Sequence, residues 1–251
     1  MQLIDTHCHL DDERFDTDRS NVIRRAAGAG IQAFIVPAIH AESCRTIHDL
    51  QQRYDLIHPA YGLHPWFCDK HREEDFALLA ELLGACVAVG ECGLDFGLCN
   101  TDAETQLRWL RPQLQLAVDF NLPVILHAYK ATDMIIGEIK KQPGLRGVVH
   151  SFSGSRQQAQ QLIDRGFCLG FGGAITHPHA NRLHELVRQL PLSHMLLETD
   201  APDQTPYGQR GKRNEPVFII EIIRQLAKLR DMDTNEITDI CNANAKELFN
   251  L

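Results

Sequence analysis

The chain has 251 residues, a net charge of -8 and a hydrophobic content of 44%, which is enough for one large core. This acidic balance excludes a general basic field for nucleic acid, so a phosphate-rich substrate would have to meet local cations or a metal. The eight cysteines are scattered and form no CxxC pair, which argues against a disulfide scaffold. The N-terminus has no basic region followed by an apolar core, so we expect no leader. No apolar run approaches the roughly 20 residues that a membrane span needs. We expect one domain over residues 1–251, in the cytoplasm and with reduced thiols.

The first predicted strand covers residues 4–9, with apolar Leu3 and Ile4 leading into it. Side chains two positions apart on a strand share a face, so His7 and His9 would converge and could hold one metal ion. An HxH pair alone is equally compatible with one histidine bonded in the core and the other solvated. The remaining chain has to decide between these two interpretations.

Seven further short apolar runs follow in order, at 31–37, 56–62, 87–90, 124–127, 147–150, 167–171 and 195–198. Helical segments separate them, including 19–30, 42–53, 73–83 and 104–121. Runs this apolar indicate a parallel sheet covered by helices, and eight repeats favour closure into a TIM (β/α)8 barrel. An open doubly wound sheet is the alternative. Two C-terminal helices are predicted at 215–229 and 234–249, the second with Thr234 as its cap and Glu236 close behind.

Metal-competent side chains end six of the eight apolar runs, always at the carboxyl end, where the loops of an α/β barrel carry function. These residues are His7, His9, His64, Glu91, His127, His150 and Asp200. Taken singly, Glu91 or Asp200 could cap a helix and His150 could be a core histidine. Together they would cost several kcal/mol to bury without a cation.

Even without His64, the remaining four histidines and two carboxylates exceed the three protein ligands that one catalytic zinc ion needs. Two metals that share a bridging ligand fit this number. A carboxylate suits the bridge because each oxygen can face one cation, and Glu91 is the best placed candidate.

Four segments resemble the signature segments of the TatD-like DNase family, a branch of the metal-dependent amidohydrolase superfamily. They read DTHCHLD at 5–11, GECGLD at 90–95, HSFSG at 150–154 and ETDAP at 198–202, and the similarity continues to 242–244 and 248–249. The resemblance implies a TIM barrel and hydrolysis with two divalent cations such as Zn, Mn or Mg. By position it implies that one metal is held by His7, His9 and Asp200, that the second is held by His127 and His150, and that Glu91 bridges the two.

The resemblance also implies catalytic roles for Asp200, Glu91 and His64, with His64 directed at a scissile phosphate. A metal-activated hydroxide would attack the phosphorus, while Asp200 orients the water or accepts its proton. The loop at 209–214 offers three cations, and we expect Arg213 to bind a backbone phosphate, although an ordinary solvated loop reads the same way.

The chain departs from the family pattern at two places where substrate would lie. The family tends to carry an arginine two residues after the histidine that His127 matches, but this chain has Ala128-Tyr129-Lys130, so Lys130 is the expected cation. The loop at 201–206 carries an acid and an amide where the family often has an apolar pair.

The favoured function is therefore a two-metal phosphodiesterase or deoxyribonuclease acting on nucleic-acid ends, with DNA or another phosphoester as its partner. An amidohydrolase or a small phosphoester hydrolase with the same dinuclear site is the alternative, and a non-catalytic metal-binding protein is a third. We expect a monomer. Two further features are ambiguous: His177 and His179 flank a proline that favours a loop, and Trp66 with Phe67 could stack on a base or anchor a loop.

Overall fold

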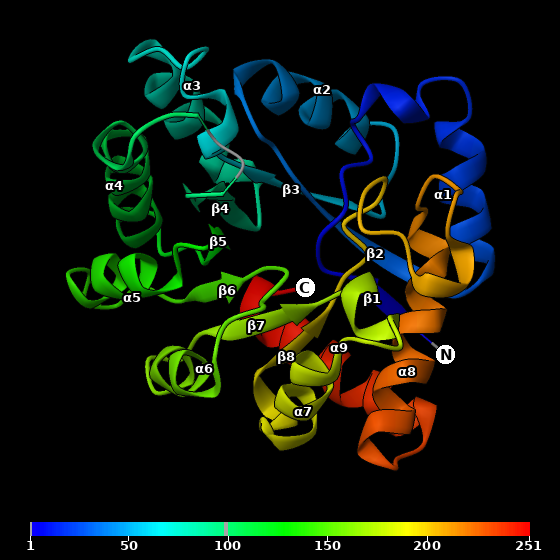
Figure 1. Cartoon of the computed structure of the whole chain (residues 1–251). Helices are drawn as coiled ribbons and strands as arrows, with labels where there is room; N and C mark the ends of the chain where they lie inside the picture. The colour runs from blue at the N-terminus through cyan, green and yellow to red at the C-terminus, as the bar shows by residue number, and fades with distance from the viewer. Residues whose placement is uncertain (1, 98–99) are drawn as a thin grey trace. The chain divides into compact units, whose positions relative to one another are not determined.

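The computed structural model describes residues 2–97 and 100–251, so Cys99 lies outside the described residues. Eight strands form one sheet in the order β1 to β8, and every register that is resolved between neighbours is parallel (Figure 1). The strands are β1 (Leu3–Asp5), β2 (Ile31–Pro37), β3 (Ile57–Tyr61), β4 (Ala88–Asp95), β5 (Val124–Tyr129), β6 (Gly147–Val149), β7 (Cys168–Phe171) and β8 (Met195–Leu197).

Helices separate consecutive strands, and two more follow β8. They are α1 (Arg19–Gly28), α2 (Ala41–Gln51), α3 (Glu74–Leu82), α4 (Ala103–Asp119), α5 (Thr132–Lys140), α6 (Arg156–Ile163), α7 (Asn181–Gln189), α8 (Ile219–Arg230) and α9 (Thr234–Phe249). A strand order that follows the sequence is the order of a TIM barrel, whereas a doubly wound sheet reverses its order at a switch point. The predicted TIM barrel with added C-terminal helices is confirmed.

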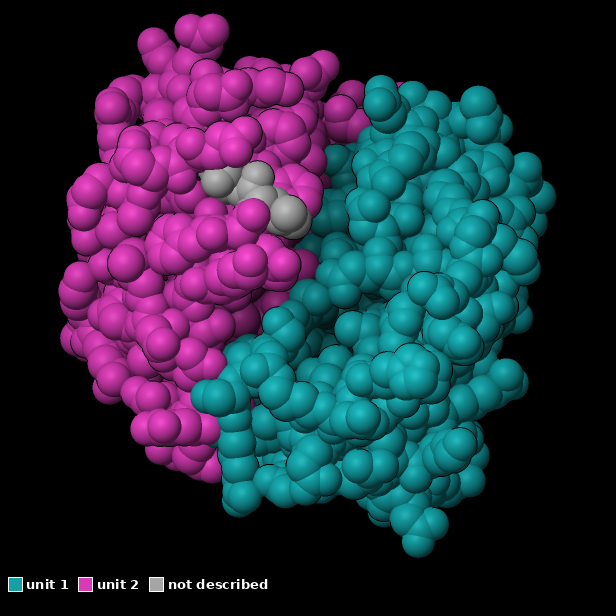
Figure 2. Space-filling view, viewed as in Figure 1, with its two compact units in different colours: residues 1–36, 151–156, 169–251 teal, residues 37–150, 157–168 magenta. Residues whose placement is uncertain are grey.

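The chain divides into two compact units, coloured separately in Figure 2. Unit 1 comprises residues 1–36, 151–156 and 169–251, and unit 2 comprises residues 37–150 and 157–168. The single domain over 1–251 stays a prediction.

Unit 1 contains β1, β2 and β8, whose backbones are joined around the first segment of the chain. The Thr6 amide donates to the Leu197 carbonyl (3.1 Å), and the Cys8 amide donates to the Ile35 carbonyl (3.1 Å). On α9, the Asn242 side chain accepts a hydrogen bond from the Ile4 amide and donates one to the Gln2 carbonyl. Both edges of the first strand are therefore fixed by residues far away in the sequence.

Unit 2 contains β3 to β6, which are buried almost throughout because helices cover them. Strand β4 is buried over its whole length, including its polar residues, and its register with β5 places Gly93 opposite His127 and Asp95 opposite Tyr129. These pairings carry the carboxyl end of β4 alongside that of β5.

Most predicted boundaries shift by a few residues, and helix α8 begins at Ile219 instead of at residue 215. Three differences concern strand β1, strand β4 and the start of helix α9. Strand β1 ends at Asp5, so His7 and His9 lie in the extended segment after it, and β4 continues through Glu91 to Asp95 instead of ending at Gly90. Helix α9 is capped by Asp233, whose carboxylate accepts from the Asn235 amide; Thr234 is the first residue inside the helix.

No helix among the described residues is long and apolar enough to cross a bilayer. The cysteines at described positions are free thiols. Cys8 and Cys92, which neighbour predicted ligands, are fully buried, and burial raises the pKa of both thiols. Both are packed in the core.

Candidate functional site

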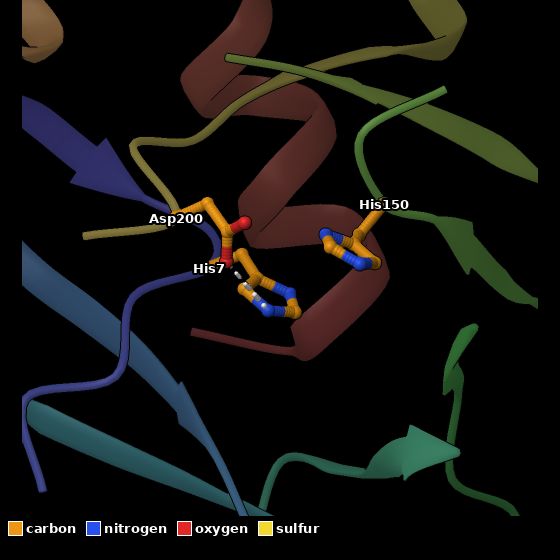
Figure 3. Close-up of side chains that lie close together, drawn as sticks. All are labelled: His7, His150 and Asp200. Carbon is orange, nitrogen blue, oxygen red and sulfur yellow. Dashed lines mark ion pairs between the residues drawn. The ribbon is translucent and has the colours of Figure 1, made fainter. Parts of the chain in front are cut away.

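Three of the predicted ligands lie together in unit 1. The Nε2 atoms of His7 and His9 are 3.3 Å apart, and each is 3.5 Å from Oδ1 of Asp200. Figure 3 shows the His7 ring beside the Asp200 carboxylate. The two imidazole rings meet edge to face at 80°, so both present a ring nitrogen to the same carboxylate oxygen.

The backbone holds this cluster in place. The Asp200 amide donates to the His7 carbonyl (2.8 Å), and the His9 amide donates to the Ala201 carbonyl (2.7 Å). Asp200 has a φ of 55°, a left-handed conformation that aspartate tolerates better than most residues. The turn after β8 is thereby fastened to the segment after β1.

The buried carboxylate of Asp5 is hydrogen-bonded to both of these segments. Asp5 accepts hydrogen bonds from the Thr199 amide (2.9 Å), the Thr199 hydroxyl (2.6 Å) and the His7 amide (3.3 Å). Burial raises the pKa of Asp5 to about 7, although these hydrogen bonds oppose the shift. Asp5 thus fixes the residues that precede His7 and Asp200.

The second oxygen of Asp200 is held by an amide. Gln204 donates through Nε2 to Asp200 Oδ2 (2.6 Å), while its Oε1 accepts from the Ser151 hydroxyl (2.9 Å). The two contacts together define which way the Gln204 amide faces. Gln204 is the amide in the loop that departs from the family pattern, and its position beside Asp200 gives that departure a function.

Unit 2 gathers the other predicted ligands around Glu91. Its Oε1 lies 2.8 Å from His150 Nε2, 3.1 Å from His127 Nδ1 and 3.4 Å from His64 Nε2. His127 Nδ1 and His150 Nε2 are themselves 3.2 Å apart. Glu91, His64 and His150 are buried, so these polar groups are shielded from water.

His127 is oriented by a second carboxylate, Asp95. The distance from His127 Nε2 to Asp95 Oδ2 is 2.9 Å, which places the ring proton on Nε2 and directs the lone pair of Nδ1 toward Glu91 and His150. Burial opposes protonation of His127, but the hydrogen bonds to Asp95 and Glu91 outweigh it and raise its pKa. A cation bound between His127 and Glu91 would replace that second proton.

His64 is the third imidazole beside Glu91, and its surroundings favour a neutral ring. Its Nδ1 accepts a hydrogen bond from the Trp66 amide (3.1 Å), so the neutral ring carries its proton on Nε2, the atom that faces Glu91. Burial lowers the pKa of His64 to about 4. The proton on Nε2 excludes that nitrogen from metal coordination while this tautomer persists.

The donor atoms of each cluster lie close to the separations expected for ligands of one bound cation. Atoms held about 2.1 Å from one ion lie about 3.0 to 3.4 Å from one another. The two histidines and Asp200 of unit 1 span 3.3 to 3.5 Å, and Glu91, His127 and His150 of unit 2 span 2.8 to 3.2 Å. Mixed imidazole and carboxylate donors suit Zn, Mn and similar divalent ions. The residues present therefore fit a divalent metal in both clusters.

The two predicted phosphate contacts have different surroundings. Lys130, exposed at the end of β5, has its Nζ 5.5 Å from the centre of the Tyr129 ring. Arg213 is held by two carboxylates, at 2.8 Å from Asp18 and 3.1 Å from Glu215, and its guanidinium lies on the Phe15 ring. Lys130 keeps its charge at the surface, whereas the charge of Arg213 is largely compensated.

Of the ambiguous histidines, His177 follows a short helical turn and its ring lies 5.6 Å from that of Tyr207. His179 is exposed in the loop that precedes α7.

Sequence reasoning gave no role to Asp95, Gln204 or Asp5. A signal existed for Asp95: Glu91, Gly93 and Asp95 alternate along one strand and so share a face. It was hidden because the predicted strand stopped at Gly90.

Comparison with known proteins identifies the family of the chain. Residues 4–250 match the family described as TatD related DNase. The chain is 36% identical to an uncharacterized metal-dependent hydrolase, YabD of Bacillus subtilis, over 99% of both chains, and 34% identical to a 3'-5' ssDNA/RNA exonuclease, TatD of Erwinia tasmaniensis, over 99% of this chain and all of that one. The crystal structure of YjjV from Escherichia coli, a TatD homologue, superposes with a TM-score of 0.94 at 38% identity and covers 99% of this chain and 98% of its own. The predicted family, fold and enzyme class, a metal-dependent hydrolase, are confirmed. The chain belongs to the TatD related DNase family.

Proposed function

We propose that this protein hydrolyses phosphodiester bonds at the ends of nucleic acids, with one divalent cation held by His7, His9 and Asp200 and a second held by His127 and His150. Two donor clusters, each with the spacing of a bound ion, support this proposal. The carboxyl ends of all strands of a TIM barrel meet on one face, and on that basis we assign Glu91 as the bridging ligand. A relative of this chain carries the name of an ssDNA/RNA exonuclease, which supports nucleic acid as the substrate.

When bound, the cations would lower the pKa of a coordinated water and neutralise charge on the phosphate. Asp200 contributes through its two oxygens. Oδ1 faces His7 and His9, while Oδ2 is held by the Gln204 amide, so the carboxylate has a fixed direction in which to orient the attacking water and accept its proton.

His64 donates a hydrogen bond to the group being transferred. Because its pKa is lowered to about 4, it is neutral at pH 7 and stabilises developing charge through its Nε2 proton rather than as a cation. We propose Lys130 as the contact to a neighbouring phosphate. Arg213 remains a proposed contact, one that would have to be shared with Asp18 and Glu215.

The free thiols support a reducing, cytoplasmic location as part of the same proposal. The monomeric state stays a prediction that light scattering can test.

The decisive experiment uses a single-stranded oligonucleotide labelled at one end and incubated with the purified protein. We expect stepwise shortening that a chelator abolishes and that Mn²⁺, Zn²⁺ or Mg²⁺ restores. Asp200→Asn should lower the rate at least 100-fold, because it weakens both a ligand and the proton acceptor. Asp203→Asn, in the same loop but paired with Arg14 at the surface, is the matched control and should retain the rate.

Chelator-resistant cleavage, or turnover of N-acyl compounds or lactones alone, would contradict the proposal and favour the amidohydrolase alternative. Normal activity in a folded His127→Ala protein would argue against catalysis at the second cluster.

A further inference from the structure

Two aromatic rings in unit 2 are left in solvent beside the Glu91 cluster. Trp66 is 48% exposed and Tyr129 is 40% exposed, whereas most large apolar side chains of this protein are buried. Each follows an imidazole of the cluster by two residues: Trp66 comes after His64, and Tyr129 comes after His127. Each ring is therefore close in the chain to a histidine, His64 or His127, that we expect to act in phosphodiester hydrolysis.

Asp95 anchors the Trp66 ring directly and holds the backbone at Gly97, against which the Tyr129 ring packs. Its Oδ2 accepts a hydrogen bond from the Trp66 indole nitrogen (2.7 Å), and its Oδ1 accepts one from the Gly97 amide (2.8 Å). The Tyr129 ring packs against Gly97 so closely that a Cβ there would lie 2.2 Å from Tyr129 Cε1. The same carboxylate orients His127, whose ring centre is 6.1 Å from that of Trp66.

This arrangement differs from that of a loop anchor. An aromatic side chain that secures a loop buries its face, but here the polar atom of Trp66 is bonded and about half of the side chain stays exposed. The ring is held rigidly and remains open to a ligand. Partly exposed aromatic side chains next to the proposed catalytic site suit unstacked nucleobases, because every base has a π-face that can stack.

A cation accompanies the rings. Lys130 Nζ lies 5.5 Å from the centre of the Tyr129 ring and is exposed, so a phosphate next to a base stacked on Tyr129 would be within its reach.

We propose that Trp66 and Tyr129 form a stacking surface that binds the bases next to the scissile phosphate. This inference rests on the proposed nuclease function and assigns its specificity. Stacking on one aromatic side chain changes affinity by about tenfold or more, and a duplex cannot supply it because its bases are already stacked.

The experiment compares kcat/KM on a single-stranded oligothymidylate with kcat/KM on an oligonucleotide of the same length whose terminal residues lack bases. The intact protein should prefer the substrate with bases by about tenfold or more. Trp66→Ala and Tyr129→Ala should bring this ratio toward one, and Trp66→Phe, which keeps a ring but loses the bond to Asp95, should retain most of it. Phe120→Ala is the matched control, because Phe120 is 42% exposed in the same unit but caps α4 at its C-terminal end.

An unchanged ratio in Trp66→Ala overturns the proposal, even where both rates fall, because an equal loss on both substrates shows that Trp66 acts only through Asp95. A binding measurement separates this result from failure of the nuclease function. The chain has two tryptophans, and Trp109 is only 6% exposed, so oligothymidylate added with chelator to Trp109→Phe should quench the fluorescence of Trp66. Quenching in chelator, combined with no cleavage after Mn²⁺, Zn²⁺ or Mg²⁺ is added, would refute the nuclease function alone. Absence of quenching would refute the stacking surface.

Discussion

Asp95 shows how much of this site depends on a residue outside the two donor clusters. It accepts hydrogen bonds from His127, from the Trp66 indole and from the Gly97 amide, and it is fully buried. A carboxylate behind a metal-binding imidazole fixes the ring and raises its basicity. The Nδ1 atom of His127 is directed at Glu91 for this reason.

We expect Asp95→Asn to lower metal affinity and turnover by about 10- to 100-fold without unfolding the protein. The asparagine has one acceptor oxygen where the aspartate has two, so it cannot serve His127, Trp66 and Gly97 at once. Calorimetric titration with Mn²⁺ and the initial rate of oligonucleotide cleavage measure the two effects. Asp119→Asn, an exposed acid at the end of α4, should change neither quantity, and an Asp95→Asn protein with normal affinity would show that His127 needs no such support.

The individual ligands could be found from the sequence because each ends an apolar run. Their partners could not. Gln204 contacts Asp200 within a turn in which both residues have a positive φ. Glycine is the usual sequence signal for a positive φ, and neither residue is a glycine. Contacts between segments far apart in the chain determine which carboxylate accepts a hydrogen bond from which histidine.

At the scale of single elements, the pairing of β4 with β5 sets the geometry of unit 2. Gly93 lies opposite His127 with a φ of 151°, and a Cβ there would lie 2.0 Å from the His127 carbonyl oxygen. Both the backbone angle and the close approach exclude a side chain.

Gly93→Ala should therefore lower the melting temperature by several degrees or prevent folding, because the strained φ alone costs more than about 1 kcal/mol. Gly137→Ala is the opposite case. Gly137 lies inside α5 with open space around its Cα, so alanine should stabilise that helix by about 0.5 to 1 kcal/mol. Thermal unfolding followed by circular dichroism distinguishes the two, and equal melting temperatures would show that β4 can move away from β5.

Helices α4 and α5 are joined by a carboxylate whose charge depends on pH. Glu138 on α5 accepts two hydrogen bonds from Arg111 on α4, at 3.1 Å each, and one from Lys141. Its hydrogen bonds with Arg111, followed by those with Lys141, lower its pKa below the ordinary 4.5. A lowered carboxyl pKa stabilises the fold above pH 4.5, and this stabilisation is lost as the pH falls through the folded-state pKa.

Glu138→Gln should thus be less stable than the original protein at pH 7, and the difference should shrink as the pH is lowered from about 5 to about 3. Urea unfolding at a series of pH values measures it. The exposed pair of Glu185 and Arg188 on α7 is the reference, because Glu185→Gln should have little effect at any pH. A constant difference across the pH range would mean that the Glu138 charge contributes nothing.

Elements that depend on local sequence signals were predicted correctly, whereas an element that depends on long-range contacts was not. Strand β2 and helix α9 have the bounds that the sequence predicted, because an apolar run between Gly30 and Pro37 and a long amphipathic stretch are local signals. Strand β4 was predicted too short, since GECGLD interrupts its apolar run with two acids and two glycines. Those residues belong to the strand only because Glu91 and Asp95 are satisfied by histidines from elsewhere.

For the molecule as a whole, bound metal should be a large contribution to stability. Cations that bind the folded chain and not the unfolded one stabilise it by about 2.7 kcal/mol per site at a free concentration of one hundred times Kd. For a protein of this size, that corresponds to a rise in melting temperature of roughly 5 to 10 °C.

Chelator-treated protein should melt at the lower temperature, and the melting temperature should rise with the logarithm of added Mn²⁺ or Zn²⁺. Differential scanning fluorimetry across a metal series measures this. His7→Ala should flatten the response, because it removes a ligand from the unit 1 cluster. If no divalent cation changed the melting temperature, neither cluster would bind a divalent cation.

The hydrogen bonds of Asn242 have a consequence for biosynthesis. Ile4 and Gln2 find their partner on a residue that the ribosome adds about 240 positions later. His7 and His9 emerge long before Asn242, yet the hydrogen bonds of Asn242 to the strand before them form only when α9 has left the exit tunnel. While translation is still under way, the nascent polypeptide should therefore be unable to capture its ions at that end.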